Sequence, residues 1–200
     1  MKTMKKLLIL ALAALLLFSG CGKKTAAPTS ADGVKTLGDA LALGEDAFKQ
    51  SGFSEDTYIY VFELAGTYYR AIADIPADVS EKLWDLEFDD DYDKNLTELI
   101  TPLTVKTVEN LSEKIPAKEE LDKLVGKTGK ELLDDGWSVW GYDLDSMQFY
   151  LHYGMFAYQV TFEKPAKPLE NTDDFDEEAA IAPLKVESIA FDGIGDATDL

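Results

Sequence analysis

Cysteine and histidine are almost absent from this chain of 200 residues, which contains one of each. A single cysteine cannot form an internal disulfide, so the folded part must rely on a hydrophobic core. A zinc site needs more ligands than one histidine supplies, and a catalytic imidazole needs a nucleophile or an orienting acid beside it. We therefore expect His152 to be a strand residue that faces solvent or makes one hydrogen bond. We expect no catalytic residue, no metal site and no cofactor.

Basic residues are also scarce. Residues 1–20 contain three of the 19 basic residues and none of the 38 acidic ones, so the rest of the chain has 16 basic residues against 38 acidic ones, a net charge of −22. This charge repels phosphate, so nucleic acid is not an expected partner, and anionic lipid head groups would be repelled too. Attachment to a membrane would therefore require a separate anchor.

The N-terminal residues supply a candidate anchor. An apolar run at residues 7–18 follows three lysines, and it is shorter than the ~20 residues that span a bilayer. It ends in Ser19-Gly20-Cys21. These features resemble a bacterial lipoprotein signal peptide, although Phe18 stands where that motif prefers Leu or Val. The resemblance implies cleavage after residue 20, acylation of Cys21 and a lipid-anchored protein on the extracytoplasmic face of the cell membrane. The alternative is an ordinary secretory signal with a chance cysteine.

The sequence after the anchor predicts a tether followed by a duplication. Residues 21–34 are small and polar, as in a flexible linker. Further on, DDYDKNLTELITPLTVKTV at residues 90–108 is answered by DDFDEEAAIAPLKVESI at residues 173–189. In both copies the apolar alternation of the final segment slips by one residue, which predicts a β-bulge at the same place. We predict two homologous units, residues 35–117 and 118–200.

Each unit is expected to pair helices with an antiparallel sheet. Helical spacing predicts a helix-turn-helix in each copy, ended by Gly52 in the first and by Gly136 in the second. The strands predicted from period-two patterns and turn residues are 57–64, 67–74, 147–153 and 155–162, together with the two repeated segments. Residues 76–86 are predicted to be helical in the first copy, whereas their counterpart after Pro165 is short, acidic and interrupted by proline. The fold class is therefore α+β, with two tandem units that each pack a helix-turn-helix on an antiparallel sheet.

This order of elements resembles the β-lactamase inhibitor protein and related small bacterial envelope domains, over most of the chain beyond the tether. The pattern Leu-x-Gly-Lys-Thr followed by Leu-x-x-x-Gly-Trp, within residues 124–137, is similar to one found in lipoproteins of Gram-positive bacteria. Both resemblances imply a location and a fold. Neither carries a residue motif from which an activity follows.

The first acidic turn has only part of the pattern of a calcium-binding loop. Asp89, Asp91 and Asp93 alternate as in an EF-hand, but Lys94 stands where the turn glycine belongs and Ile100 where a bidentate glutamate is needed. We expect solvated turns without a tight metal site, and the alternative is weak binding of divalent cations.

Aromatic residues provide the candidate binding surface. Tyr58, Tyr60 and Phe62 share one face of a predicted strand whose other face carries Ile59 and Val61. If the aliphatic face packs on the helices, the rings are exposed, and Tyr and Trp are enriched in interface cores. The alternative is that the two units pack these rings against each other as an ordinary core. The full set of candidates is Tyr58, Tyr60, Phe62, Trp137, Trp140 and Tyr142.

The sequence thus favours a lipid-anchored extracytoplasmic protein that is not an enzyme. We expect a binding module that presents a sheet face to a protein or cell-wall partner. The alternative is an accessory lipoprotein that captures a small molecule or an ion, which a buried pocket with a polar lining would distinguish.

Overall fold

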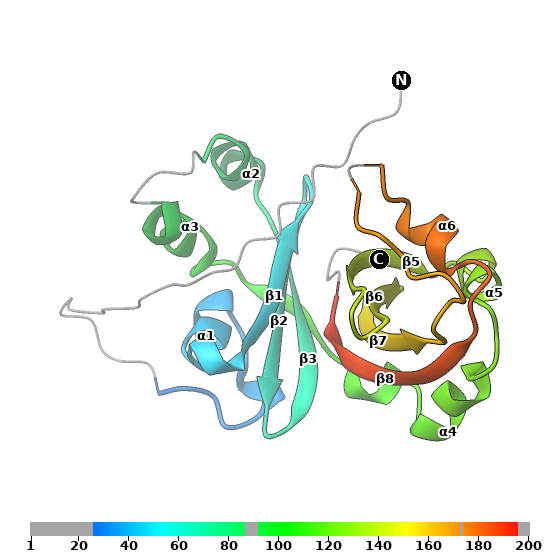
Figure 1. Ribbon diagram of the computed structural model, residues 1–200. Helices are drawn as coiled ribbons and strands as arrows, with labels where there is room; N and C mark the ends of the chain where they lie inside the picture. The colour runs from blue at the N-terminus through cyan, green and yellow to red at the C-terminus, as the bar shows by residue number, and fades with distance from the viewer. Residues whose placement is uncertain (1–25, 87–91, 173, 196–200) are drawn as a thin grey trace. The chain divides into compact units, whose positions relative to one another are not determined.

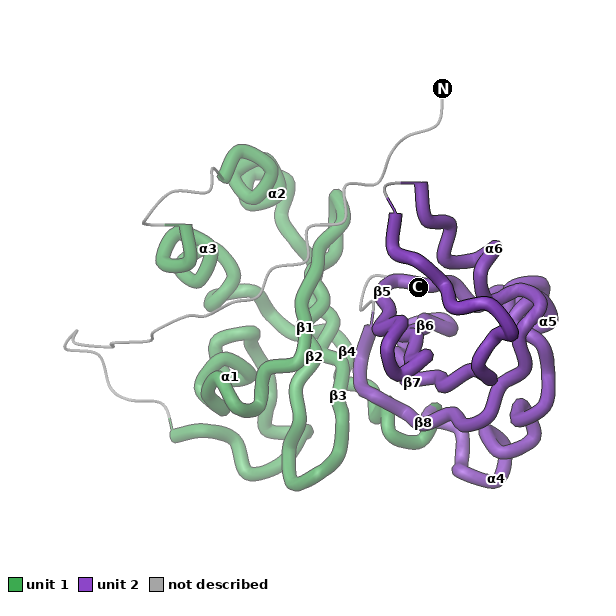
Figure 2. Tube along the Cα trace, in the orientation of Figure 1, with its two compact units in different colours: residues 1–114 green, residues 115–200 purple. Residues whose placement is uncertain are grey.

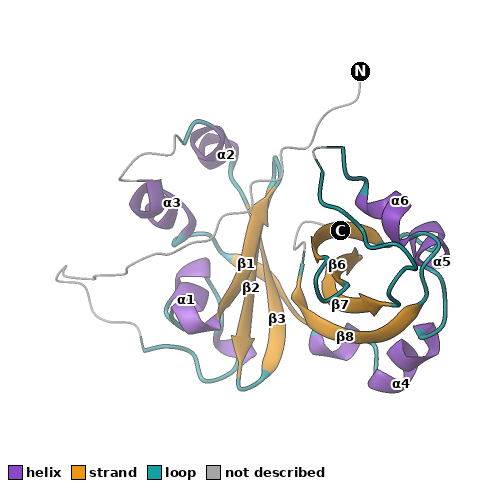
Figure 3. Ribbon diagram, viewed as in Figure 1, coloured by secondary structure: helices purple, strands orange, loops and turns teal. Residues whose placement is uncertain are grey.

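A computed structural model of the chain describes residues 26–86, 92–172 and 174–195. Within these residues the chain forms two four-stranded antiparallel sheets, with strand orders β1-β2-β3-β4 and β5-β6-β7-β8, accompanied by short helices (Figure 3). It divides into two compact units, with the first ending at Lys114 and the second beginning at Ile115 (Figure 2). The chain therefore has an α+β fold made of two similar units, as the sequence predicted.

Unit 1 places its helices on one side of its sheet (Figure 1). Its strands are β1 (Phe48–Phe53), β2 (Thr57–Leu64), β3 (Thr67–Asp74) and β4 (Val105–Asn110). Its α-helices are α1 (Leu37–Leu41), α2 (Ala77–Trp84) and α3 (Tyr92–Ile100), and three single 3-10 turns lie at Ala31–Gly33, Glu45–Ala47 and Ser112–Lys114. Helix α2 confirms the helix that was predicted after the β2–β3 hairpin.

Unit 2 repeats this plan with even shorter helices. Its strands are β5 (Ser138–Asp143), β6 (Gln148–Tyr153), β7 (Phe156–Phe162) and β8 (Val186–Ile194). Its helices are α4 (Lys118–Leu121), α5 (Gly129–Asp134) and α6 (Glu177–Ile181), with a 3-10 turn at Asp122–Leu124 between the first two. None of the helices within the described part of the chain has the length and apolar character needed to cross a membrane.

The repeated sequence phrase holds the first capped helix of each unit beside the sheet through backbone hydrogen bonds. In unit 1 the bonds run from Leu37 N to Leu103 O (2.9 Å), from Gly38 N to Thr101 O (3.0 Å) and from Val105 N to Lys35 O (2.8 Å). In unit 2 the equivalent bonds run from Gly129 N to Leu184 O (2.8 Å), from Lys130 N to Ala182 O (3.0 Å) and from Val186 N to Lys127 O (2.8 Å). The duplication therefore repeats a tertiary connection as well as a sequence.

The bulge predicted in each copy is also confirmed. Lys106 is left unpaired between the pairs Ala73↔Val105 and Ile72↔Thr107. Glu187 is left unpaired in the same way between Phe162↔Val186 and Thr161↔Ser188. Each extra residue returns the following apolar side chains to the core face of the sheet, because side chains along a strand alternate between its two faces.

The helix-turn-helix prediction is wrong for unit 1 within the described residues. Helix α1 is followed by a 3-10 turn, and the stretch expected to end a second helix is strand β1, in which Gly52 pairs with Ile59. The true counterpart of Gly136 is Gly44. Both glycines have a positive φ, 97° and 93°, which suits a residue without a Cβ atom at the end of a helical segment. In unit 2 the expected pair of helices is present as α4 and α5.

The predictions for the signal peptide and for the acidic turns lie wholly or partly outside the described residues. They concern residues 1–20, Cys21 and the acidic residues 89–91 and 173. Of the neighbouring acidic residues, Asp93 lies in the first turn of α3, and Asp176 caps α6 by accepting a hydrogen bond from the Ala179 N–H at 2.9 Å. The proposed tether reached residue 34, but Val34 is buried in the core of unit 1, so the folded unit begins no later than that residue.

Matching capping boxes begin α1 and α5. Thr36 and Asp39 form the first box, and Thr128 and Glu131 form the second. Burial raises the pKa of the Asp39 carboxyl, but hydrogen bonds from the Lys35 and Thr36 N–H groups and from the Thr36 hydroxyl outweigh that effect and lower it. Hydrogen bonds from the Thr128 N–H and hydroxyl likewise lower the pKa of Glu131. Both carboxylates are therefore held in their ionised form by the folded chain.

This arrangement predicts a loss of stability in acid. A carboxyl whose pKa is lower in the folded chain than in the unfolded chain stabilises the fold above its unfolded pKa, and that contribution disappears as the pH falls. The unfolded values are about 4 for both residue types. We expect the free energy of unfolding in urea to decrease between about pH 5 and pH 3, and the double variant Asp39→Asn, Glu131→Gln to show a smaller decrease. Equal pH dependence in both proteins would assign the acid sensitivity to other carboxylates.

Candidate binding face of unit 2

The aromatic residues of β2 lie in the core of unit 1. Tyr58, Tyr60 and Phe62 are 2%, 3% and 0% exposed and pack with Leu37 and Ile100. The expectation that they are exposed is wrong, because the helices cover the aromatic face of β2 and not its aliphatic face. The aliphatic residues Ile59 and Val61 are buried as well, so neither face of the strand presents a binding surface.

Burial also changes the acidity of the tyrosines in this core. The Tyr58 hydroxyl lies 3.3 Å from Ser51 Oγ, and burial raises the pKa of Tyr58 to about 12 although that hydrogen bond opposes the shift. Burial raises the pKa of Tyr60 as well. Both hydroxyls therefore stay protonated at neutral pH and neither can serve there as a base.

Of the three candidates in unit 2, Trp137 is buried and Tyr142 is partly buried. Trp137 is 7% exposed, and its ring lies 4.9 Å from the rings of both Tyr153 and Tyr158. Tyr142 is half-buried and lies between Phe149 and Phe175, at ring distances of 5.9 Å and 5.0 Å. Its hydroxyl is 3.0 Å from Asn171 Oδ1. The predicted exposure is therefore wrong for Trp137, while Tyr142 keeps part of its surface exposed.

Trp140 is the candidate that the structure leaves accessible, with 55% of its surface exposed. It is the extra residue of a bulge in β5, between the pairs Val139↔Leu151 and Gly141↔Tyr150. A bulge redirects a side chain that regular alternation would place elsewhere. The indole lies 5.6 Å from the Tyr150 ring and 5.4 Å from the His152 ring. The bulge thus joins three rings from two neighbouring strands into one cluster.

Strand pairing defines the face on which this cluster lies. Phe149 and Leu151 of β6 are fully buried. Side chains along a strand alternate between its two faces, so Tyr150 and His152 point to the opposite side of the sheet. The register then assigns the same side to the residues paired with them on the other strands. We call this surface the open face. It comprises Ser138, Trp140, Gly141, Asp143, Gln148, Tyr150, His152, Ala157, Gln159, Thr161, Ser188, Ala190 and Gly193.

The open face combines rings with amides, hydroxyls and small residues. Its only carboxylate, Asp143, lies at a corner, where it accepts hydrogen bonds from the Asp145 N–H (3.1 Å) and from Ser146 Oγ (2.8 Å). None of its members is a lysine or an arginine. At one end the backbone of Gly195 runs against His152, since a Cβ atom there would lie 2.5 Å from His152 Nε2. The chemistry available is stacking and neutral hydrogen bonding.

The equivalent bulge in unit 1 carries a different side chain. Lys49 is the extra residue of β1, between Phe48↔Phe62 and Gln50↔Val61, and its ammonium forms an ion pair with Glu63 at 2.9 Å. The two units therefore share the bulge, but only the one in unit 2 presents an aromatic side chain.

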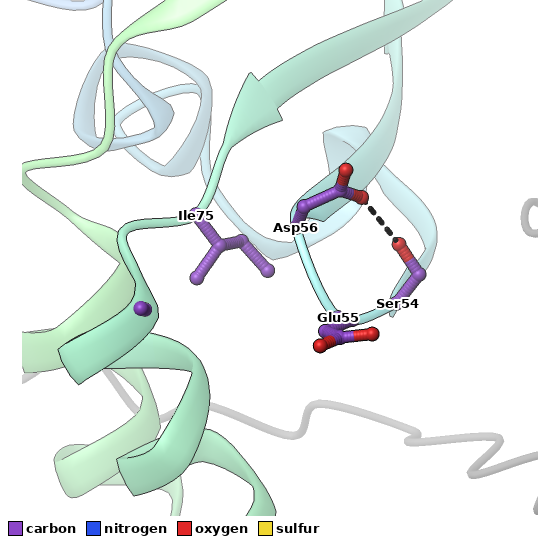
Figure 4. A pocket seen from close by; sticks show the side chains of 5 residues that line it. Ser54, Glu55, Asp56 and Ile75 are labelled. Atoms are coloured by element: carbon purple, nitrogen blue, oxygen red, sulfur yellow. Dashed lines mark hydrogen bonds between the residues drawn. The ribbon is translucent and has the colours of Figure 1, made fainter.

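A pocket beside the β1–β2 turn is the second candidate (Figure 4). It has a volume of about 420 Å³ and is lined by Ser54, Glu55, Asp56, Ile75 and Ala77. Ser54 Oγ donates a hydrogen bond to Asp56 Oδ1 at 3.3 Å. Among the described residues no group of three or more His, Cys, Asp or Glu side chains is placed to hold a metal ion. The polar groups of this pocket do not converge on a common point.

Comparison of the chain with protein-family models, with curated proteins and with solved structures finds no significant match.

Trp140 is among the binding residues that the sequence predicts, but the two rings beside it are not. The sequence predicts only that His152 faces solvent or makes one hydrogen bond, and Tyr150 is not among the candidates. Their signal was present in the alternation of β6, where Phe149 and Leu151 have one parity and Tyr150 and His152 have the other. Trp140 lies beside Tyr150 and His152 because of the bulge in β5, and the sequence pattern of β5 does not predict that bulge.

Tyr60→Ala and Trp140→Ala are expected to differ greatly in their effect on stability. Removing the buried Tyr60 ring leaves a cavity and should lower the free energy of unfolding by about 3–5 kcal/mol. Removing the exposed Trp140 side chain should change it by no more than about 0.5 kcal/mol. Urea denaturation followed by circular dichroism measures both values. A loss of several kcal/mol in Trp140→Ala would make this residue part of the core.

Proposed function

We propose that this protein is a lipid-anchored, extracytoplasmic binding module that contacts its partner through the open face of unit 2. The observation that carries the proposal is Trp140, exposed and held beside Tyr150 and His152 on a rigid sheet. Binding energy in interfaces concentrates in a few accessible aromatic anchors, and Trp is the residue type most often found there. Strand residues lose little conformational freedom on binding, which preserves that energy.

The proposed location rests on the N-terminal sequence. A basic start, a short apolar run and small residues before Cys21 together have the form of a lipoprotein signal, and acylation would give the cysteine a function. A protein with this excess of acidic residues has little affinity of its own for anionic membranes, so the lipid anchor would supply the attachment. Unit 2 would then be free to bind a partner in the cell envelope.

Capture of a small molecule or an ion in the pocket beside the β1–β2 turn is the weaker alternative. Ligand sites bring a few polar groups together in a largely apolar cleft. The two pocket oxygens nearest each other, Ser54 Oγ and Asp56 Oδ1, already form a hydrogen bond. We therefore base the proposed function on the open face.

Cys21→Ala tests the anchor. Without the thiol no acyl chain can be attached, so we expect the variant to appear in the soluble fraction or to keep its uncleaved N-terminal segment. Fractionation of cells that express the protein, followed by mass spectrometry of the N-terminus, measures both outcomes. Membrane association and N-terminal mass that match those of the unchanged chain would refute lipidation at this residue.

Trp140→Ala tests the binding face. All proteins in this test also carry Cys21→Ala and are taken from the soluble fraction, so that no lipid anchor contributes. We expect this chain to sediment with isolated cell envelopes and the same chain with Trp140→Ala to bind at least about tenfold more weakly, as is usual for a central aromatic anchor. Trp84→Ala is the matched control, because Trp84 is 56% exposed and contacts an aromatic neighbour, Phe53, at a ring distance of 4.8 Å.

A second variant controls for loss of surface structure. Trp140→Lys introduces the residue that unit 1 has at its equivalent bulge, so the backbone there should be retained. We expect this variant to lose envelope binding while keeping its melting temperature. If either Trp140 variant binds envelopes as tightly as Trp84→Ala does, the open face is not the binding site.

A further inference from the structure

We infer that the partner of the open face is a neutral glycan whose pyranose rings have equatorial hydroxyls, an inference that rests on the proposed function of this face. Such rings expose C–H groups on their two faces and hydroxyls around their edge. The C–H groups carry partial positive charge, and the face of an aromatic ring carries partial negative charge. The Trp140 indole, 55% exposed, can therefore stack against one sugar ring.

The polar residues of the open face suit the hydroxyls of a sugar. Gln148 and Gln159 each offer both a hydrogen-bond donor and an acceptor, as do the hydroxyls of Thr161 and Ser188. A sugar hydroxyl is also both donor and acceptor, so it can satisfy any of these groups when water is displaced. Burying an amide without a partner costs free energy, which disfavours a purely apolar ligand at this face.

The layout of the face suits a short stretch of polymer. Gly141, Tyr150, Gln159 and Ala190 form one row that crosses all four strands of the sheet. With three gaps of ~4.8 Å between strands, this row is about 14 Å long. The small residues Gly141 and Ala190 at its two ends leave room for a chain to continue beyond the sheet. The row therefore fits an oligosaccharide that lies across the strands.

Charge excludes polyanions as the preferred partner. The face has no basic residue, and the two residues that β8 inserts at its bulges, Glu187 and Asp192, are exposed carboxylates. The chain after residue 20 has 16 basic and 38 acidic residues, so a polymer with phosphate or carboxylate groups would be repelled. Carboxylates at the rim of the face can instead accept hydrogen bonds from the hydroxyls of a neutral glycan.

A protein partner fits this face less well. A stable protein interface buries about 1,600 Å² in total, with a desolvated core rich in large apolar side chains. The open face has one strongly exposed large ring, and Ala157 and Ala190 are its only aliphatic members. Stacking on a single ring with neutral hydrogen bonds around it gives enough contact for a sugar polymer but leaves a protein interface without an apolar core.

The test uses the full chain in a detergent without sugar head groups. Hexamers of β-1,4-linked N-acetylglucosamine and of β-1,4-linked glucose are titrated in, and binding is followed by calorimetry and by the fluorescence of the three tryptophans. We expect saturable binding of at least one hexamer. The affinity should fall about tenfold or more in Trp140→Ala, partly recover in Trp140→Phe and stay within about twofold in Trp84→Ala. A polygalacturonate fragment should not bind.

Envelopes treated with proteinase separate this inference from the proposed function. Binding that depends on Trp140 and survives the treatment supports a glycan partner. Binding that depends on Trp140, is lost after the treatment and is accompanied by no affinity for either hexamer overturns the glycan inference, while the binding-module function stands. Envelope binding by the Cys21→Ala chain that does not depend on Trp140 contradicts the proposed function itself. Tight binding of polygalacturonate would overturn the argument from charge.

Discussion

The fold of each unit depends on a short pairing between the segment before its capped helix and the segment that leads into its last strand. Helices of four to nine residues are unstable alone in water, since nucleation costs more than so few hydrogen bonds return. In both units three backbone hydrogen bonds between these segments fix the position of the capped helix. Gly129 shows how close the approach is, because a Cβ atom there would collide with the carbonyl group of Ile181. The core forms beneath helices that are positioned in this way.

This constraint explains which aromatic residues are buried. With the helices held on one side of the sheet, the residues of β2 and β7 that face them must fill the space between, and Tyr58, Phe62 and Tyr158 do so. The side chains on the opposite face of the second sheet do not pack against the helices. There the side chains are shorter and more polar, and the Trp140 ring stands above them.

The duplicated units have kept their backbone plan and changed the side chains that use it. Both sheets have a bulge in their first strand, which supports an ion-paired lysine in unit 1 and an exposed tryptophan in unit 2. A bulge is a useful place for such a change, because its extra residue is outside the regular alternation and its replacement disturbs neither core. The proposed binding face is therefore a product of divergence between two copies of one scaffold.

The sequence by itself determined the duplication, the hairpins and the slip in the last strand of each unit, because these depend on local periodicity and on turn residues such as Gly66 and Gly154. It also predicted helix α2, and it predicted that α5 ends at Gly136. It could not show that β1 is a strand, since Phe48 fits the spacing of a preceding helix as well as the start of a strand. Only the tertiary structure decided which side of β2 faces the helices, because both sides of that strand are apolar. As a result Tyr58, Tyr60 and Phe62 are buried in the core. Trp140 is exposed, and the direction of its side chain depends on a bulge and therefore on how β5 pairs with β6.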